Sequence, residues 1–133
     1  MDPSIFIIIL VSILSYILIG MYLREDKLIV DVKKNISKVL PSVQDLHIYE
    51  GDSPRVVGKK TIYLKLYDSE GDPYDLNTLT YVCLHEIAHI LCDVTDTTGV
   101  HSPEFYRIFD KLVSMCTKEG VFNPSVPIHK DFL

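Results

Sequence analysis

The sequence lacks the features that nucleic-acid-binding proteins commonly show. It has no long basic run, no glycine–aromatic box and no zinc-knuckle spacing. Its net charge is −5, from 13 Lys and Arg against 18 Asp and Glu residues. Because non-specific binding to nucleic acid depends on concentrated Lys and Arg side chains, we predict no nucleic-acid partner.

Cysteine is scarce as well, with Cys83, Cys92 and Cys116 as the whole set. An odd number of cysteines, spread through segments with helical patterns, does not fit a disulfide framework. We therefore predict reduced thiols in a cytosol-like compartment. The chain also lacks an internal repeat and low-complexity segments, and 133 residues correspond to one domain.

The first positive feature is an apolar, charge-free run, Ile5–Leu23. As a helix, these residues would span roughly 28 Å, which is about the hydrocarbon thickness of a bilayer. We predict a transmembrane anchor over residues 1–24 that meets the lipid bilayer through residues 5–23. A cleaved signal peptide is the alternative, but no basic residue precedes the run and no small-x-small cleavage pattern follows it.

The basic residues near this run all follow it: Arg24, Lys27, Lys33, Lys34 and Lys38. Under the positive-inside rule, this asymmetry predicts a single-pass protein whose C-terminal domain lies on the cytoplasmic side. Reduced thiols agree with that compartment.

The rest of the chain mixes helical and strand periodicities, which predicts an α+β fold. We expect a domain over residues 25–122 and an irregular tail over 123–133. The expected elements are a helix over 28–40 stopped by Pro41, strands over 45–50 and 61–67, a helix over 78–92 capped by Asp75 or Asn77, and a helix that Ser102 caps and Gly120 ends. The turn 51–54 and the loops 68–75 and 93–99 connect them.

The most informative motif is His85-Glu86-Ile87-Ala88-His89. Two histidines four residues apart lie on one helix face, so both imidazoles can reach one metal ion. Glu86 lies about 100° further round the helix, where it can contact a water molecule without being a ligand. The surrounding helix is almost wholly apolar and hence buried, and unpaired polar groups there cost about 1–3 kcal/mol each. A hydrogen-bonded core cluster without metal is the alternative.

A catalytic zinc site usually has three protein ligands and one open position. His101 follows the polar loop and immediately precedes a capped helix, so it is our candidate for the third ligand. The rival candidates are Cys92, Asp93, Asp96 and Glu104. His47 and His129 are isolated in the sequence, and we expect them to be surface or locally paired residues.

At these residues the sequence resembles the WLM and SprT-type zinc metallopeptidases. It is similar in the H-E-x-x-H motif, in the segment His101-Ser102-Pro103-Glu104-Phe105 and in the approach Tyr74–Leu79. The likeness spans roughly residues 45–122. It implies a zincin-like core, with a small sheet over the motif helix, and three histidine ligands that include His101. The layout of one anchor and a minimal domain also resembles predicted membrane metallopeptidases of large DNA viruses, which implies a host or virion membrane.

We therefore predict a membrane-anchored zinc peptidase that binds one Zn²⁺ per chain and hydrolyses polypeptide substrates, with Glu86 activating water. We expect the strand over 61–67 to offer an edge for an extended substrate. Tyr81 and Tyr106 are candidates for a second oxyanion donor, although tyrosines on such helices usually belong to the core. The alternatives are a catalytically inactive zinc-binding membrane adaptor and a purely structural membrane protein.

Overall fold

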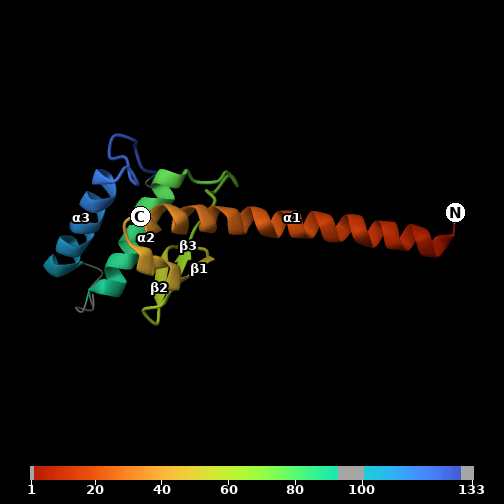
Figure 1. Ribbon diagram of the computed structural model, residues 1–133, viewed down its shortest axis with the longest axis horizontal. Coiled ribbons are helices and arrows are strands. Elements are labelled where there is room, and N and C mark those ends of the chain that lie inside the picture. Colours follow the sequence, from red (N-terminus) through yellow and green to blue (C-terminus); the bar gives the residue numbers. More distant parts are fainter. Residues whose placement is uncertain (1, 93–100, 130–133) are drawn as a thin grey trace.

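The computed structural model describes residues 2–92 and 101–129. For residues 22–26 it describes the backbone but not the side chains. The described elements are, in order, α1 (Pro3–Ser37), a 3₁₀ helix η1 (Pro41–Asp45), β1 (His47–Glu50), β2 (Arg55–Val57), β3 (Thr61–Leu64), α2 (Leu76–Leu91) and α3 (Pro103–Lys118). Helices and a small three-stranded sheet thus form an α+β arrangement, as predicted (Figure 1).

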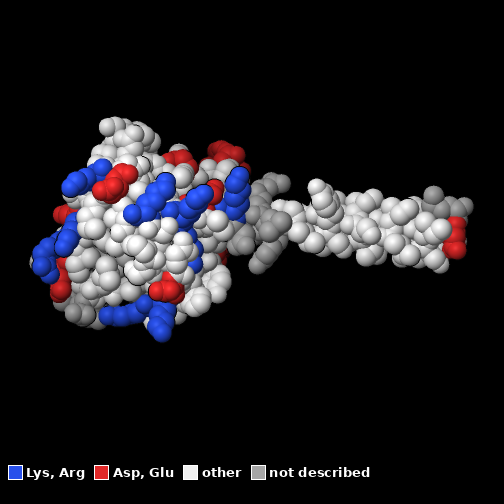
Figure 2. Space-filling view, in the orientation of Figure 1, with Lys and Arg blue, Asp and Glu red and all other residues white. Residues whose placement is uncertain are grey.

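Helix α1 begins as an isolated apolar rod and ends inside the domain (Figure 1). The 19 residues Pro3–Met21 are long and apolar enough to cross a membrane or to be a signal sequence, and none of this segment is buried. In Figure 2 the rod shows no described charge except near its tip, whereas Lys, Arg, Asp and Glu cover the domain. The same helix continues without a break through residue 24, where we placed the boundary of the anchor. That division remains a prediction.

The inner end of α1 supplies part of the core. Val32 and Ile36 are fully buried, as the helical spacing of apolar residues over 28–40 predicted. The helix ends at Ser37, three residues earlier than expected, because the chain turns into η1 at Pro41. Asn35 connects three parts of the domain, since its Nδ2 donates to Thr80 Oγ1 at 3.2 Å and to the Val121 carbonyl oxygen at 2.9 Å.

The sheet has the strand order β1-β3-β2, with β1 parallel and β2 antiparallel to β3. Side chains alternate along β3, so that Ile62 and Leu64 are fully buried and Tyr63 faces the other side. Both predicted strands are present but shorter than expected, because η1 occupies 41–45 and the ladder ends at Leu64. Strand β2 was not predicted.

One expectation about this sheet was wrong. The strand over 61–67 was expected to offer a free edge, but β3 is the central strand and pairs on both sides over Thr61–Leu64. The backbone groups that a peptide would need are therefore already hydrogen-bonded there. The edges of the sheet belong to β1 and β2 instead.

Helix α2 lies in the middle of the domain, in contact with α1, α3, β2 and β3 (Figure 1). This position explains its apolar sequence, because nearly every face of the helix meets another element. Its N-cap is Asp75, one of the two predicted caps, and the carboxylate accepts a hydrogen bond from Thr78 N at 3.1 Å. The helix begins two residues before the predicted start, at Leu76, and ends at Leu91.

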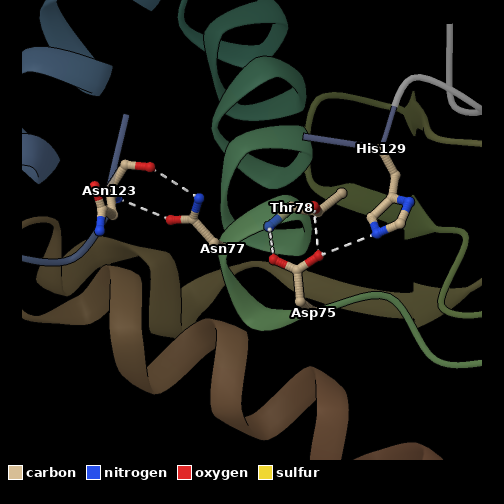
Figure 3. A network of polar contacts seen from close by, with 5 residues as sticks. All are labelled: Asp75, Asn77, Thr78, Asn123 and His129. Atoms are coloured by element: carbon tan, nitrogen blue, oxygen red, sulfur yellow. Dashed lines mark hydrogen bonds and ion pairs between the residues drawn. The ribbon is translucent and has the colours of Figure 1, made fainter. Parts of the chain in front are cut away.

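Polar contacts from the C-terminal segment hold the start of α2 (Figure 3). Asn77 Nδ2 donates to the Asn123 carbonyl oxygen at 3.0 Å, and Asn123 N donates back to Asn77 Oδ1 at 2.8 Å. His129 lies beside the Asp75 carboxylate, with 3.8 Å between Nε2 and Oδ1. The part of the predicted irregular tail that the structure describes, 123–129, contains no helix or strand.

Helix α3 begins as the sequence predicted. Ser102 is its N-cap, with Oγ accepting from Phe105 N at 3.1 Å, and Pro103 is the first helical residue. Four of its apolar side chains are buried, namely Phe105, Phe109, Leu112 and Cys116. The helix ends at Lys118, and Gly120 follows with a φ of 72°, a conformation in which a residue without Cβ is favoured. The predicted loop 93–99 lies outside the described residues.

Candidate metal centre

Two adjacent helices bring three histidines together. His85 and His89 come from the second half of α2, and His101 comes from the residue just before the N-cap of α3. Their ligand nitrogens all lie within 4.8 Å of one another, and each residue is partly exposed. The three ring centroids form a nearly regular triangle, with separations of 5.0, 4.8 and 4.9 Å. The convergence that we predicted for these residues is confirmed.

One distance within this triangle fits a shared metal ion. His89 Nε2 and His101 Nε2 are 3.1 Å apart. Two imidazole ligands of a tetrahedral zinc ion, each bound at 2.0–2.1 Å, would have nitrogens about 3.3 Å apart. Without metal, the same distance allows an N–H···N hydrogen bond from one neutral ring to the other. Three histidines are close enough to bind a metal ion, and which metal it is remains a prediction.

Glu86 follows His85 in the chain, within α2, and is buried, with 6 % of its surface exposed. Burial raises the pKa of its carboxyl group to about 7, because the charged form loses hydration. Within the described part of the chain, the Glu86 carboxylate has no hydrogen bond or ion pair. A nearby metal dication would favour the charged form and so lower this pKa again.

The rival ligands are separate from the histidine cluster or lie outside the described residues. Glu104, in the first turn of α3, pairs with Arg107 at 3.7 Å. Cys92 is the buried C-cap of α2, and its Sγ lies 3.7 Å from Ser102 Oγ. Neither side chain is close enough to the three histidines to belong to the group of ligand atoms that could hold one ion. Asp93 and Asp96 lie outside the described residues.

The two isolated histidines are surface residues with local contacts, as expected. His47 is exposed on β1 and stacks on Tyr49, with ring centroids 6.4 Å apart. His129 packs edge-on against Tyr74, beside Asp75.

The two tyrosine candidates differ in their surroundings. Tyr81 packs between Phe109 and Phe122, at centroid distances of 5.2 and 5.6 Å. Burial, with a smaller contribution from Asp110, raises its pKa, and its partly buried ring packs against the core. Tyr106 is half exposed, and its ring centroid lies 5.8 Å from that of His101. Only Tyr106 is therefore beside the metal centre.

The sequence comparison finds relatives in viruses. The uncharacterized protein 136R of invertebrate iridescent virus 6 is 34 % identical over 91 residues, which are 66 % of this chain and 49 % of that protein. The uncharacterized protein 042R of invertebrate iridescent virus 3 is 33 % identical over 90 residues, 66 % of this chain and 54 % of that protein. The chain thus spans about half the length of the curated relatives it matches. Viral relatives agree with the predicted viral origin, and their names state no activity.

The other two comparisons find no match. No protein-family model matches the sequence, and no solved structure matches the fold. The case for a function therefore depends on the geometry of the metal centre.

Proposed function

We propose that this chain is a membrane-anchored zinc peptidase of the zincin-like type, related to the WLM and SprT-type metallopeptidases. The observation that carries the proposal is the meeting of His85, His89 and His101, with the buried residue Glu86 directly after His85 on the same helix. Two of these ligands and the carboxyl group come from one H-E-x-x-H helix, which is the arrangement expected of a metallopeptidase.

In this proposal the three imidazoles hold one zinc ion and leave a position open. The ion, when bound, polarises the scissile carbonyl and lowers the pKa of a water molecule toward about 7. Glu86 accepts a proton from the attacking water, whose oxygen bonds to the carbonyl carbon of the peptide. Glu86 then passes that proton to the leaving nitrogen as the C–N bond breaks. The products are a carboxylic acid and an amine, so atoms and charge balance.

An extended substrate would need a free strand edge near α2. Strand β2 contacts α2 and, among the described residues, pairs only with β3, so its outer edge is the best placed of the two edges of the sheet. Val57 at the end of β2 has 52 % of its surface exposed, which leaves room for a neighbouring chain. We propose that a peptide pairs with β2, in place of the strand expected from the sequence.

Metal dependence tests the proposal directly. The full-length chain in detergent micelles is expected to bind about one zinc per chain and to cleave members of a broad peptide library. A chelator should abolish cleavage, and added zinc should restore it. Zinc binding without any cleavage would favour the inactive adaptor instead. A chain that takes up no zinc and melts at the same temperature with or without chelator would be the structural membrane protein.

The membrane part of the proposal has its own test. If α1 spans the bilayer with the basic residues inside, the domain lies in the cytoplasm. A protease added to the cytoplasmic side of sealed membranes should then digest the domain, and detergent should not be needed. Protection of the domain from this protease would indicate the opposite topology, with the domain on the other side of the membrane. A mature chain that begins near residue 24 would show that the apolar segment is a signal peptide.

A further inference from the structure

We infer that Phe105 is a positioning residue for the metal centre, because its ring forms a wall that all three histidine ligands share. The inference rests on the metal site proposed above, but it does not depend on peptidase activity. Phe105 itself offers no ligand atom, so it would act through the three imidazoles.

The ring contacts are the first observation. The centroid of Phe105 lies 4.2 Å from that of His101, 4.5 Å from that of His89 and 5.0 Å from that of His85. These separations are at the short end of the range for aromatic pairs, so the rings are in van der Waals contact. Among the described residues, no other aromatic ring outside the histidine triad contacts all three imidazoles. Of the three imidazoles, Phe109 contacts only that of His85, at 5.4 Å, and Tyr106 contacts only that of His101, at 5.8 Å.

The second observation is how firmly Phe105 is held. Only 1 % of its surface is exposed, and its ring stacks on Phe109 at 5.8 Å with an interplanar angle of 18°. Its backbone N–H donates to Ser102 Oγ at 3.1 Å. This cap hydrogen bond joins Ser102, which follows the ligand His101, to Phe105, which contacts all three ligands. The start of α3 therefore fixes the third ligand and the wall together.

A fixed flat wall would matter for metal affinity. A histidine side chain rotates about two bonds, and each free ring must be ordered when a metal ion binds. Packing against Phe105 limits these rotations before the ion arrives, which reduces the entropy that binding loses. The apolar ring also keeps water away from one side of the ligands. Loss of a residue that orients metal ligands by hydrogen bonds commonly lowers metal affinity by about 10–100-fold, and we take the lower end of this range for a residue that orients them by packing.

The test compares Phe105→Leu with Phe122→Leu in the full-length chain in detergent. Phe122 is equally suited to the change, because it is buried and its ring contacts Tyr81 but none of the three ligands. Zinc affinity would be measured by competition with a chromophoric chelator, and Co²⁺ would report ligand geometry through its visible absorption bands. Thermal unfolding of the metal-free proteins would show whether the two variants lose similar stability.

We expect Phe105→Leu to weaken zinc binding by about tenfold or more and to change the Co²⁺ spectrum. Phe122→Leu should keep the wild-type spectrum and an affinity within about threefold. Phe105→Tyr, which keeps the flat ring, should keep the wild-type zinc affinity and Co²⁺ spectrum. If Phe105→Leu does not fold, the same loss is expected of Phe105→Met, which keeps more of the volume.

Two results would contradict the inference. One is a Phe105→Leu or Phe105→Met protein with wild-type affinity and spectrum. The other is an equal loss of affinity in Phe122→Leu, which would show that general stability and not ring contact sets metal binding. A wild-type chain that binds neither Zn²⁺ nor Co²⁺ would instead overturn the metal site itself, so the two failures are distinguishable.

Discussion

Glu86→Gln is expected to keep its zinc and to lose peptide hydrolysis by roughly a hundredfold or more, as removal of a general base commonly does. Glutamine has the same shape and can still hold a water molecule by a hydrogen bond, but it cannot accept the proton. None of the three imidazoles is altered, so the metal should stay in place. The measurement is the rate of cleavage by protein whose zinc content has been confirmed.

The environment of Glu86 makes this a clean substitution. Burial already raises the pKa of this carboxyl group to about 7 by penalising its charged form. Among the described residues Glu86 has no ion pair, so a neutral amide removes none. Glu70→Gln is the matched control, because Glu70 is an exposed residue in the loop before α2. Equal cleavage by wild type and Glu86→Gln would show that Glu86 is not the base.

The parts of the fold that the sequence predicted well are those with strong local signals. Asp75 and Ser102 precede apolar helical patterns, and both are the observed N-caps of α2 and α3. Likewise, Ile62 and Leu64 alternate with Tyr63 in the segment predicted as a strand, and β3 buries both of these aliphatic side chains. In each case the residue's own neighbours in the chain determine the local conformation.

The sheet was harder to predict, because strand order depends on contacts between distant segments. The three residues of β2 are too few to show an alternating pattern, so this strand was not expected. Without it, the strand over 61–67 seemed to have a free edge. Pairing with β2 and β1 covers both sides of β3. The error therefore follows directly from one missing short strand.

In the metal centre too, local spacing could be predicted from the sequence, whereas contacts between distant segments could not. The spacing of His85 and His89 placed them on one face of a helix, and the structure agrees. The role that we infer for Phe105 was missed, because a phenylalanine on an apolar helix face is normally a core residue. Its position was the available signal, since it lies three residues after the N-cap that follows His101. Only the ring distances show that it contacts two ligands from α2 and a third that precedes α3.

The third ligand gives the second large effect that we expect. Loss of a residue that only orients a metal ligand commonly lowers metal affinity by about 10–100-fold. His101→Ala should weaken zinc binding by more than this, because it removes one of the three ligand atoms. The His89–His101 distance of 3.1 Å already fits a shared ion. Added zinc should raise the melting temperature of the wild-type chain, since binding to the folded state stabilises it. The His101→Ala protein should show no such rise at the same zinc concentration.

Glu104→Ala is the decisive comparison, because some zinc peptidases take a carboxylate ligand from a following helix. Here Glu104 lies three residues after His101, but its carboxylate pairs with Arg107 at 3.7 Å, and that arginine is largely exposed. An exposed pair of this kind contributes about 0–1 kcal/mol, so its loss should leave the fold intact. Zinc affinity should fall by less than about tenfold, because no ligand atom is removed. If Glu104→Ala strips the metal while His101→Ala retains it, the carboxylate moves to the ion when zinc binds, and His101 is not the ligand.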